Sequence, residues 1–239
     1  MPVYRGTHYP LLTPRVLRPN EVSKLAVWLR ADAIQGLADG DPVGTWPDSS
    51  GLARDATQST AAQKPTYRAS RAAFSGKPVL EFDTVDDCIA SAFGATLSQP
   101  NTFFVVAKVG ATGAQRFMID GDGVGGRHAI FQESVTRWQY YAGSLVDDGA
   151  SDTSVHIFQA TFNGASSVLR VDGASGTTGN TGADSIIGVI LGAQQVGTSN
   201  FGGDIAEVMV YNAALSLDQI NGLGLYLAAK YGVFWKVAG

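Results

Sequence analysis

The feature that most constrains this chain is a succession of short runs rich in β-branched and aromatic residues, separated by clusters of Gly, Asp, Asn and Ser. In the first run, Leu25, Val27 and Leu29 occupy every second position, which is typical of a strand with one buried face. The other runs lie at 78–83, 102–109, 116–120, 128–132, 137–142, 155–162, 167–171, 186–191 and 204–211. Short strands at this spacing, with no helices between them, predict an all-β antiparallel sandwich.

One helix is indicated near the C-terminus. Ser216 and Gln219 have the spacing of a capping box, in which each side chain bonds the other residue's backbone N–H. An apolar stripe follows at helical spacing, formed by Ile220, Leu223 and Leu227. Gly232 suits the left-handed residue that ends many helices. These signals predict a helix over about 217–231 that packs its stripe on the sandwich.

The first twenty residues differ from the rest in composition. They hold four of the nine prolines and three arginines but no acid, so they carry +3, whereas the rest, with 14 basic and 21 acidic side chains, carries −7. We predict an extended arm over 1–20 and one jelly-roll domain over 21–239. Because the charges are opposite, we expect the arm to dock on a neighbouring subunit of a homo-oligomer. The residues predicted to make this contact are Arg5, Leu11, Leu12, Arg15, Leu17 and Arg18.

The composition argues against several classes of protein and partner. Charged residues make up 16% and aromatic residues 10%, unlike an intrinsically disordered chain. A net charge of −4 without a basic stripe argues against a nucleic-acid partner. The single cysteine, Cys88, excludes an internal disulfide framework. Neither an apolar run long enough to cross a membrane nor a secretory signal is visible, so no membrane partner is expected.

Motifs rich in Trp, Asp and Gly stand at both ends of the predicted domain. The N-terminal motifs comprise Trp28, Leu29, Ala31, Asp32, Trp46, Asp48, Ser50, Gly51, 55–58, 76–78, Phe82, Asp83, Asp86 and Asp87. The C-terminal motifs comprise 203–208, Tyr211, Asn212, Leu215, Ser216 and 226–232. Together they resemble the concanavalin A-like, laminin-G-like jelly-roll domains of phage and bacterial surface proteins. The resemblance implies this fold, and Thr84, where the family has glycine, weakens the case for a left-handed turn there.

Some relatives with this fold hold Ca²⁺ near one sheet edge through loop carboxylates and carbonyls. The resemblance therefore implies ligands among the aspartates of the matched motifs, and we select Asp32, Asp83 and Asp87 because hard oxygen atoms suit Ca²⁺. The alternative is that these aspartates are solvated or bond the backbone of their own turns. Nothing in the sequence requires calcium or another cofactor.

Two pairs of residues are candidates for a functional site. Trp138 and Tyr140 share one face of a predicted strand, so they would stack on a sugar or a partner protein if that face is exposed. The alternative is that both rings face the core. Glu81 and Asp83 also share a face, like the paired carboxylates of jelly-roll glycosidases, but this strand matches the non-catalytic pattern better. We therefore expect no catalytic residue and no enzyme.

These observations favour a non-catalytic structural and recognition module. We expect a phage virion protein, in capsid decoration, a fibre or a tail, that contacts other virion or surface proteins through its arm. The alternative is a secreted or surface carbohydrate-binding module with a glycan ligand, located outside the cell or on its surface. A third hypothesis is a glycan-cleaving enzyme that uses Glu81 and Asp83.

Overall fold

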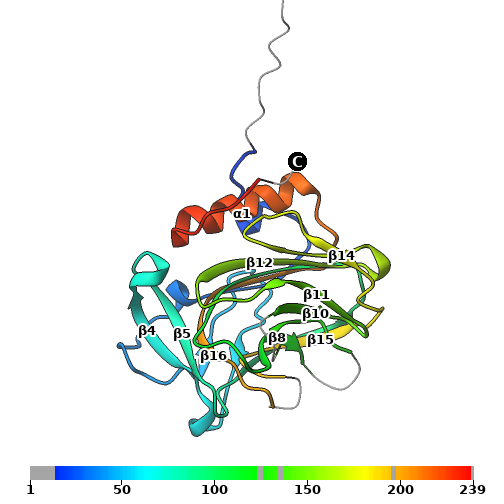
Figure 1. The fold of residues 1–239 in the computed structure, drawn as a ribbon. Helices are drawn as coiled ribbons and strands as arrows, with labels where there is room; N and C mark the ends of the chain where they lie inside the picture. The colour runs from blue at the N-terminus through cyan, green and yellow to red at the C-terminus, as the bar shows by residue number, and fades with distance from the viewer. Residues whose placement is uncertain (1–13, 123–125, 134–136, 195–197, 238–239) are drawn as a thin grey trace, which may run out of the picture.

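The computed structural model describes residues 14–122, 126–133, 137–194 and 198–237. Two antiparallel eight-stranded sheets lie face to face, and one helix covers the outer side of one of them (Figure 1). The predicted all-β sandwich with a C-terminal helix is therefore confirmed. No helix in the described part of the chain is long and apolar enough to cross a membrane.

The first sheet, which we call sheet A, carries the helix. Its order is β14 (Thr177–Gly179), β13 (Ser167–Val171), β12 (Val155–Phe162), β7 (Asn101–Val109), β16 (Gly202–Tyr211), β5 (Lys77–Asp83) and β4 (Thr66–Arg71), and β1 (Leu25–Arg30) also pairs with β16.

Sheet B lies opposite and is also antiparallel. Its order is β11 (Leu145–Ala150), β10 (Arg137–Tyr141), β9 (Ala129–Gln132), β8 (Arg116–Gly121), β15 (Ile186–Leu191), β6 (Ile89–Leu97), β3 (Ala56–Thr57) and β2 (Thr45–Trp46). Short 3-10 turns occur at Pro19–Glu21, Ala31–Ala33, Ala61–Gln63, Ala72–Phe74 and Gly164–Ser166.

Strand β7 contributes apolar side chains to two layers, one on each face of sheet A. Phe103 and Val105 belong to the main core between the sheets, whereas Phe104 and Val106 belong to a second cluster on the outer face of sheet A. All four side chains are fully buried because α1 (Leu217–Tyr231) covers the outer cluster. A strand that is apolar on both faces needs cover on both, and here the helix supplies the second cover.

Helix α1 begins and ends where its local signals predict. The Ser216 hydroxyl accepts a hydrogen bond from the Gln219 backbone N–H at 3.3 Å, and the Gln219 side chain accepts one from the Ser216 N–H at 2.9 Å. Gly232 ends the helix in the left-handed conformation, with φ of 69°. The stripe residues Ile220, Leu223 and Leu227 are buried in the outer cluster, so the predicted helix is confirmed.

A buried carboxylate ties α1 to sheet A. Glu207 on β16 is fully buried and accepts hydrogen bonds from Trp28 Nε1, Tyr226 Oη, Lys230 Nζ and Tyr231 Oη, at 2.6, 3.2, 2.7 and 2.7 Å respectively. Burial, and next the Glu207 charge, raises the pKa of both tyrosines, so their hydroxyls stay protonated and can donate. All five residues stand in the two groups of motifs, which explains why those motifs specify the fold.

The described end of the predicted arm packs on its own chain. The Leu17 backbone N–H donates to the Gly222 carbonyl at 3.0 Å, and the Leu17 side chain lies against the outer cluster. Pro19 is buried, and its carbonyl accepts a hydrogen bond from the Tyr211 hydroxyl at 3.0 Å. Arg15 pairs with Glu21 at the surface. Leu17 therefore packs on helix α1 of its own chain, where it stays partly exposed, and its contact with a neighbouring subunit stays a prediction.

The other predicted contact residues of the arm remain untested. The side chain of Arg18 is exposed, as is that of Arg15. Arg5, Leu11 and Leu12 lie outside the described residues.

Candidate functional site

The two aromatic residues predicted to bind a ligand lie in the core. Trp138 is 2% exposed and Tyr140 is 0% exposed. The Trp138 ring packs edge-on against Phe158, with the ring centroids 4.8 Å apart, and the Tyr140 hydroxyl donates to the Thr177 carbonyl at 2.8 Å. The ligand-binding prediction is therefore wrong and the core alternative holds, because β10 turns this face toward sheet A.

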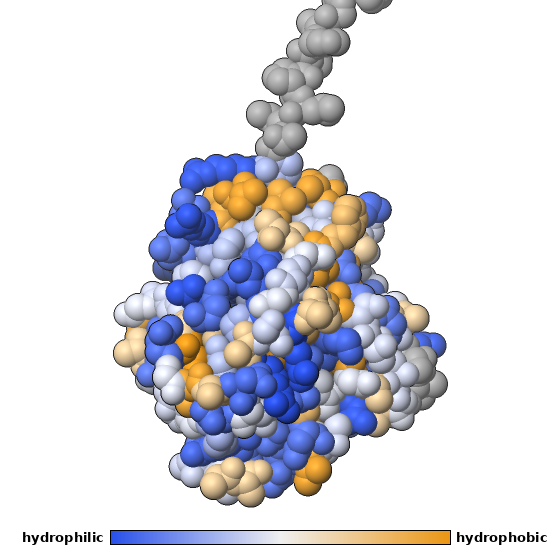
Figure 2. Space-filling view, turned by 90° about the vertical axis from the view of Figure 1, so that its left-hand side faces the viewer, coloured by the Kyte–Doolittle hydropathy of each residue, from blue (hydrophilic) through white to orange (hydrophobic). Residues whose placement is uncertain are grey.

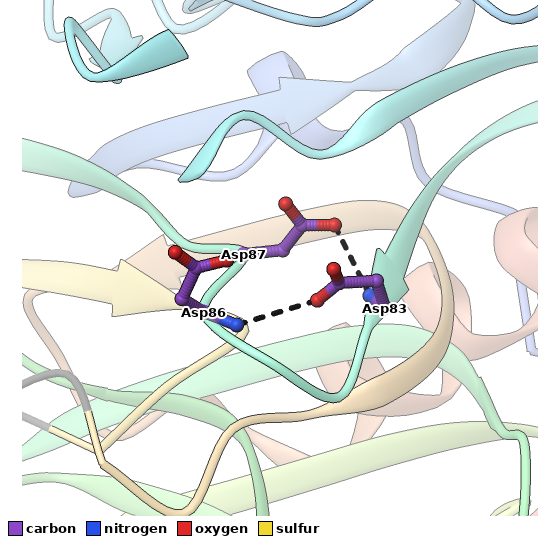
Figure 3. A group of neighbouring side chains, drawn as sticks. All are labelled: Asp83, Asp86 and Asp87. Atoms are coloured by element: carbon purple, nitrogen blue, oxygen red, sulfur yellow. Dashed lines mark hydrogen bonds between the residues drawn. The ribbon is translucent and has the colours of Figure 1, made fainter. Parts of the chain in front are cut away.

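The three aspartates selected as calcium ligands do not converge. Asp32 lies beside α1, where it contacts Lys230 at 3.1 Å and Arg30 at 3.5 Å. Asp83 and Asp87 do come together, but Asp86 completes their group, with one oxygen atom of each carboxylate within 4.8 Å of the others (Figure 3). The prediction is thus wrong for Asp32, since an ion pair to the helix holds it elsewhere.

The loop that follows β5 uses these carboxylates to hold its own backbone. Asp83 Oδ1 accepts from the N–H groups of Val85 and Asp86 at 2.8 and 3.3 Å, and Asp87 Oδ2 accepts from the Asp83 N–H at 3.1 Å (Figure 3). Thr84 takes a left-handed conformation with φ of 74°, although the residue is β-branched. A left-handed turn therefore forms at this position with threonine in place of glycine.

The electrostatics of this loop are set by crowded acids. Burial, then repulsion from Asp83 and further from Asp86, raises the pKa of Asp87 to about 7. Three carboxylates at this spacing could hold Ca²⁺, which prefers oxygen ligands. The same carboxylates are accounted for by the turn that they cap, so both alternatives considered for these aspartates stay open.

Beside this loop lies a cavity with a volume of about 560 Å³, within the usual size of a ligand pocket. Its floor is the outer face of sheet A beyond the area that α1 covers, and we call it the β4–β16 pocket. The lining residues are Thr66, Arg68, Arg71, Glu81, Phe82, Asp83, Thr84, Asp87, Lys108, Gly110, Ala111, Gly202, Gly203 and Asp204. Hydrophilic side chains cover most of the face in Figure 2, and apolar ones gather at its helix end.

Strand register places four polar residues in one row across the floor of the pocket. Glu81 on β5 pairs with Thr66 on β4 and with Asp204 on β16, and Asp204 pairs with Lys108 on β7. At about 4.8 Å between neighbouring strands, the row is about 14 Å long. A hydroxyl, two carboxylates and an ammonium group therefore follow one another across the sheet.

Glycines hollow the floor next to this row. A Cβ atom on Gly202 would lie 1.9 Å from Thr84 Cγ2, and one on Gly203 would lie 2.1 Å from the Lys108 carbonyl oxygen. Gly203 also has a backbone φ angle of 148°, which residues other than glycine rarely adopt. Both positions thus need glycine, and the absence of side chains there leaves space in the pocket.

Ion pairs fix the charged groups of the floor. The two oxygens of Glu81 each contact an arginine, Arg68 Nε and Arg71 Nη2, at 2.5 Å. Arg71 Nη2 also lies 3.3 Å from Asp204 Oδ1, which has no hydrogen-bond donor among the described residues. Burial raises the pKa of Asp204, and Arg71 partly opposes this. Lys108 makes no hydrogen bond or ion pair within the described part of the chain, so its ammonium group is free for a ligand.

The carboxylates of the candidate pair Glu81 and Asp83 already make contacts within the protein. Both oxygens of Glu81 contact arginines, and Oδ1 of Asp83 accepts hydrogen bonds from backbone N–H groups. Phe82, the aromatic residue that lines the pocket, is 2% exposed and offers no stacking surface. Hydrogen bonds from the polar row are what the pocket offers to a ligand.

Sequence reasoning missed Arg71, Lys108 and Asp204. A signal for one of them was present, because Lys108 is the only charged residue in the strand run 102–109. A single charge in a run of this kind indicates a position that reaches solvent or a ligand.

Comparison with known proteins shows the fold alone. No family model and no curated protein sequence matches the chain. Domain 4 of AbnA, a GH43 extracellular arabinanase from Geobacillus stearothermophilus, solved in complex with arabinotriose, is 14% identical with a TM-score of 0.63, over 86% of this chain and 98% of that one.

Two further solved structures are similar. The Trypanosoma rangeli sialidase in complex with sialic acid is 14% identical with a TM-score of 0.58, and the match covers 87% of this chain. It takes in only 33% of the sialidase chain, so this protein spans about a third of that relative. The binding domain of Paraclostridial Mosquitocidal Protein 1 is 12% identical with a TM-score of 0.58, over 86% of this chain and 52% of that one. The chain thus has a jelly-roll sandwich fold that it shares with domain 4 of the arabinanase, with part of the sialidase and with part of the binding domain of the mosquitocidal protein.

Proposed function

We propose that this chain is a non-catalytic carbohydrate-binding module and that the β4–β16 pocket is its binding site. The observation that carries the proposal is the polar row of Thr66, Glu81, Asp204 and Lys108 on the floor of an open pocket. Sugars present many hydroxyl groups, each of which donates and accepts a hydrogen bond, and the row supplies both kinds of partner. Support also comes from the arabinanase domain of the same fold, which was solved with arabinotriose.

The absence of catalysis is part of this proposal. Retaining glycosidases need two carboxyl groups about 5–5.5 Å apart across the sugar, one as nucleophile and one as acid. Here arginines hold both oxygens of Glu81, and backbone N–H groups hold Oδ1 of Asp83, which supports a structural role for the candidate pair. The chain should therefore bind glycans and leave them intact.

The test combines binding and hydrolysis on the same polysaccharides. Affinity electrophoresis and calorimetry with arabinan, xylan, β-glucan and alginate should detect binding to at least one of them, and incubation should release no new reducing ends. Absence of binding to every glycan would refute the proposal. Hydrolysis that Glu81→Gln abolishes would instead establish the enzyme hypothesis.

The predicted place in a phage virion, the homo-oligomer and the alternative place outside the cell or on its surface stay predictions. A binding module of this fold is compatible with each of these settings. The proposal concerns the ligand, and the setting is a separate question that the genomic neighbourhood of the coding sequence would answer.

A further inference from the structure

The β4–β16 pocket is almost balanced in charge. Its lining side chains carry three cations, Arg68, Arg71 and Lys108, and four carboxyl groups, Glu81, Asp83, Asp87 and Asp204. Four carboxyl groups against three cations give the lining side chains a net charge of about −1, which provides no strong field for an ion of either sign.

The charges are also distributed so that each free group has an opposite neighbour. Lys108 lies directly across the sheet from Asp204, and the carboxylate of Asp204 touches Arg71. A carboxylate on a ligand that reached Lys108 would also approach Asp204, and a ligand ammonium group that reached Asp204 would approach Arg71 and Lys108. Either charged ligand would meet repulsion together with attraction, whereas a hydroxyl group meets none.

A hydroxyl group can satisfy both members of the row at once. It donates to a carboxylate oxygen of Asp204 and accepts from Lys108 Nζ, and both are charge-assisted bonds, which are the stronger kind. Glu81 and Arg71 act as positioning residues, because their ion pairs fix the Asp204 side chain before the ligand arrives. The length of the row, about 14 Å by strand spacing, suits an extended chain of sugars laid across the strands.

Building on the proposed function, we propose that the β4–β16 pocket selects uncharged, hydroxyl-rich oligosaccharides, which lie across strands β4, β5, β16 and β7 and bind through Asp204 and Lys108. This assignment adds a ligand class, an orientation and two ligand-contacting residues to the general proposal of glycan binding.

The experiment measures the affinities of the full chain for three classes of oligosaccharide by calorimetry. The panel holds neutral arabino-, xylo- and gluco-oligosaccharides, anionic sialyllactose and oligogalacturonates, and cationic chitosan oligomers. The best neutral sugar should bind at least tenfold more tightly than any charged one. Its affinity should change less than about twofold between low and high salt, since no net charge is neutralised on binding.

Variants then locate the site. Asp204→Asn and Lys108→Met should each weaken binding of the best neutral sugar by roughly 10- to 100-fold, the range expected for one hydrogen bond to a charged group. The matched controls are Asp218→Asn in the first turn of α1 and Lys77→Met at an exposed position of β5, which should bind like the wild type. Circular dichroism and thermal unfolding verify that all four variants fold.

The outcomes separate this inference from the proposed function. If no member of the panel binds, glycan binding itself is refuted and the ligand assignment falls with it. If an anionic sugar binds best and Lys108→Met abolishes that binding, glycan binding stands and the selection of neutral ligands is overturned. If a neutral sugar binds and both pocket variants bind it like the wild type, the site lies elsewhere on the molecule.

Discussion

Replacing Lys230 with methionine should destabilise the protein strongly, because it removes the ammonium group that faces a buried carboxylate. Glu207 is 0% exposed, and Lys230 Nζ lies 2.7 Å from its Oε2. Taking one partner from a buried pair typically costs about 3–5 kcal/mol, since the remaining charge stays in a medium that solvates it poorly. Trp28, Tyr226 and Tyr231 still donate to Glu207, so we expect the lower end, about 3 kcal/mol.

Urea unfolding followed by far-UV circular dichroism measures this loss, and for a domain of this length it corresponds to a fall in Tm of about 6–12 °C. Lys77→Met, at an exposed site, serves as the matched control and should remain within about 0.5 kcal/mol of the wild type. The double variant Lys230→Met with Glu207→Gln should recover part of the loss, because no buried charge is left. A loss below about 1 kcal/mol in the single variant would refute the view that α1 is held by a buried charge.

Four further outcomes are expected from single substitutions. Leu227→Ala should cost about 2–5 kcal/mol in urea unfolding because this side chain of α1 is fully buried against sheet A, and an unchanged midpoint would show that the stripe is not packed. Burial lowers the pKa of His128 to about 4, so the unfolded state takes up a proton near pH 6.5 before the folded state does, and stability should fall by about 3 kcal/mol as the pH drops from 6.5 to 4. His128→Gln should lack this component, and equal pH profiles for both proteins would contradict it. The pKa of Asp87 is raised to about 7 in the folded state, so the unfolded state loses this proton first and the free energy of unfolding falls as the pH rises from about 4 to 7. The Tm of Asp87→Asn relative to that of the wild type should therefore increase between pH 5 and pH 8. Leu17→Ala should cost about 1–2 kcal/mol, whereas exposed Val16→Ala should change stability by less than about 0.5 kcal/mol, and equal effects would mean that the end of the arm is not docked on α1.

Local signals predicted local structure well. The capping box of Ser216 and Gln219 and the terminal Gly232 act within a few residues of chain, so they fixed both ends of α1 without tertiary context. Short runs of β-branched and aromatic residues likewise marked strands such as β7 and β16. Strands β4, β6 and β11 were missed, because their small or charged residues carry a weak alternating signal and only pairing with neighbours makes them strands.

The failures among the site residues share one cause. A period of two says that Trp138 and Tyr140 share a face, but either face satisfies the pattern, and the direction depends on where the other sheet lies. The motifs that contain Asp32, Asp83 and Asp87 likewise say nothing about which of these carboxylates meet. Asp32 forms an ion pair with Lys230, on a helix that lies almost two hundred positions away in the chain.

The sequence by itself determined an all-β sandwich, the place and ends of its helix and the motifs that join β1, β16 and α1. The tertiary structure alone decided the site. Thr66, Glu81, Lys108 and Asp204 lie far apart along the chain and form one row only because four strands pair in one register. Hydrophobic patterning encodes which residues of a strand share a face, and many different sequences have the same pattern. The position of a hydrogen-bonding group relative to others depends on strand order and register, which the whole core fixes cooperatively.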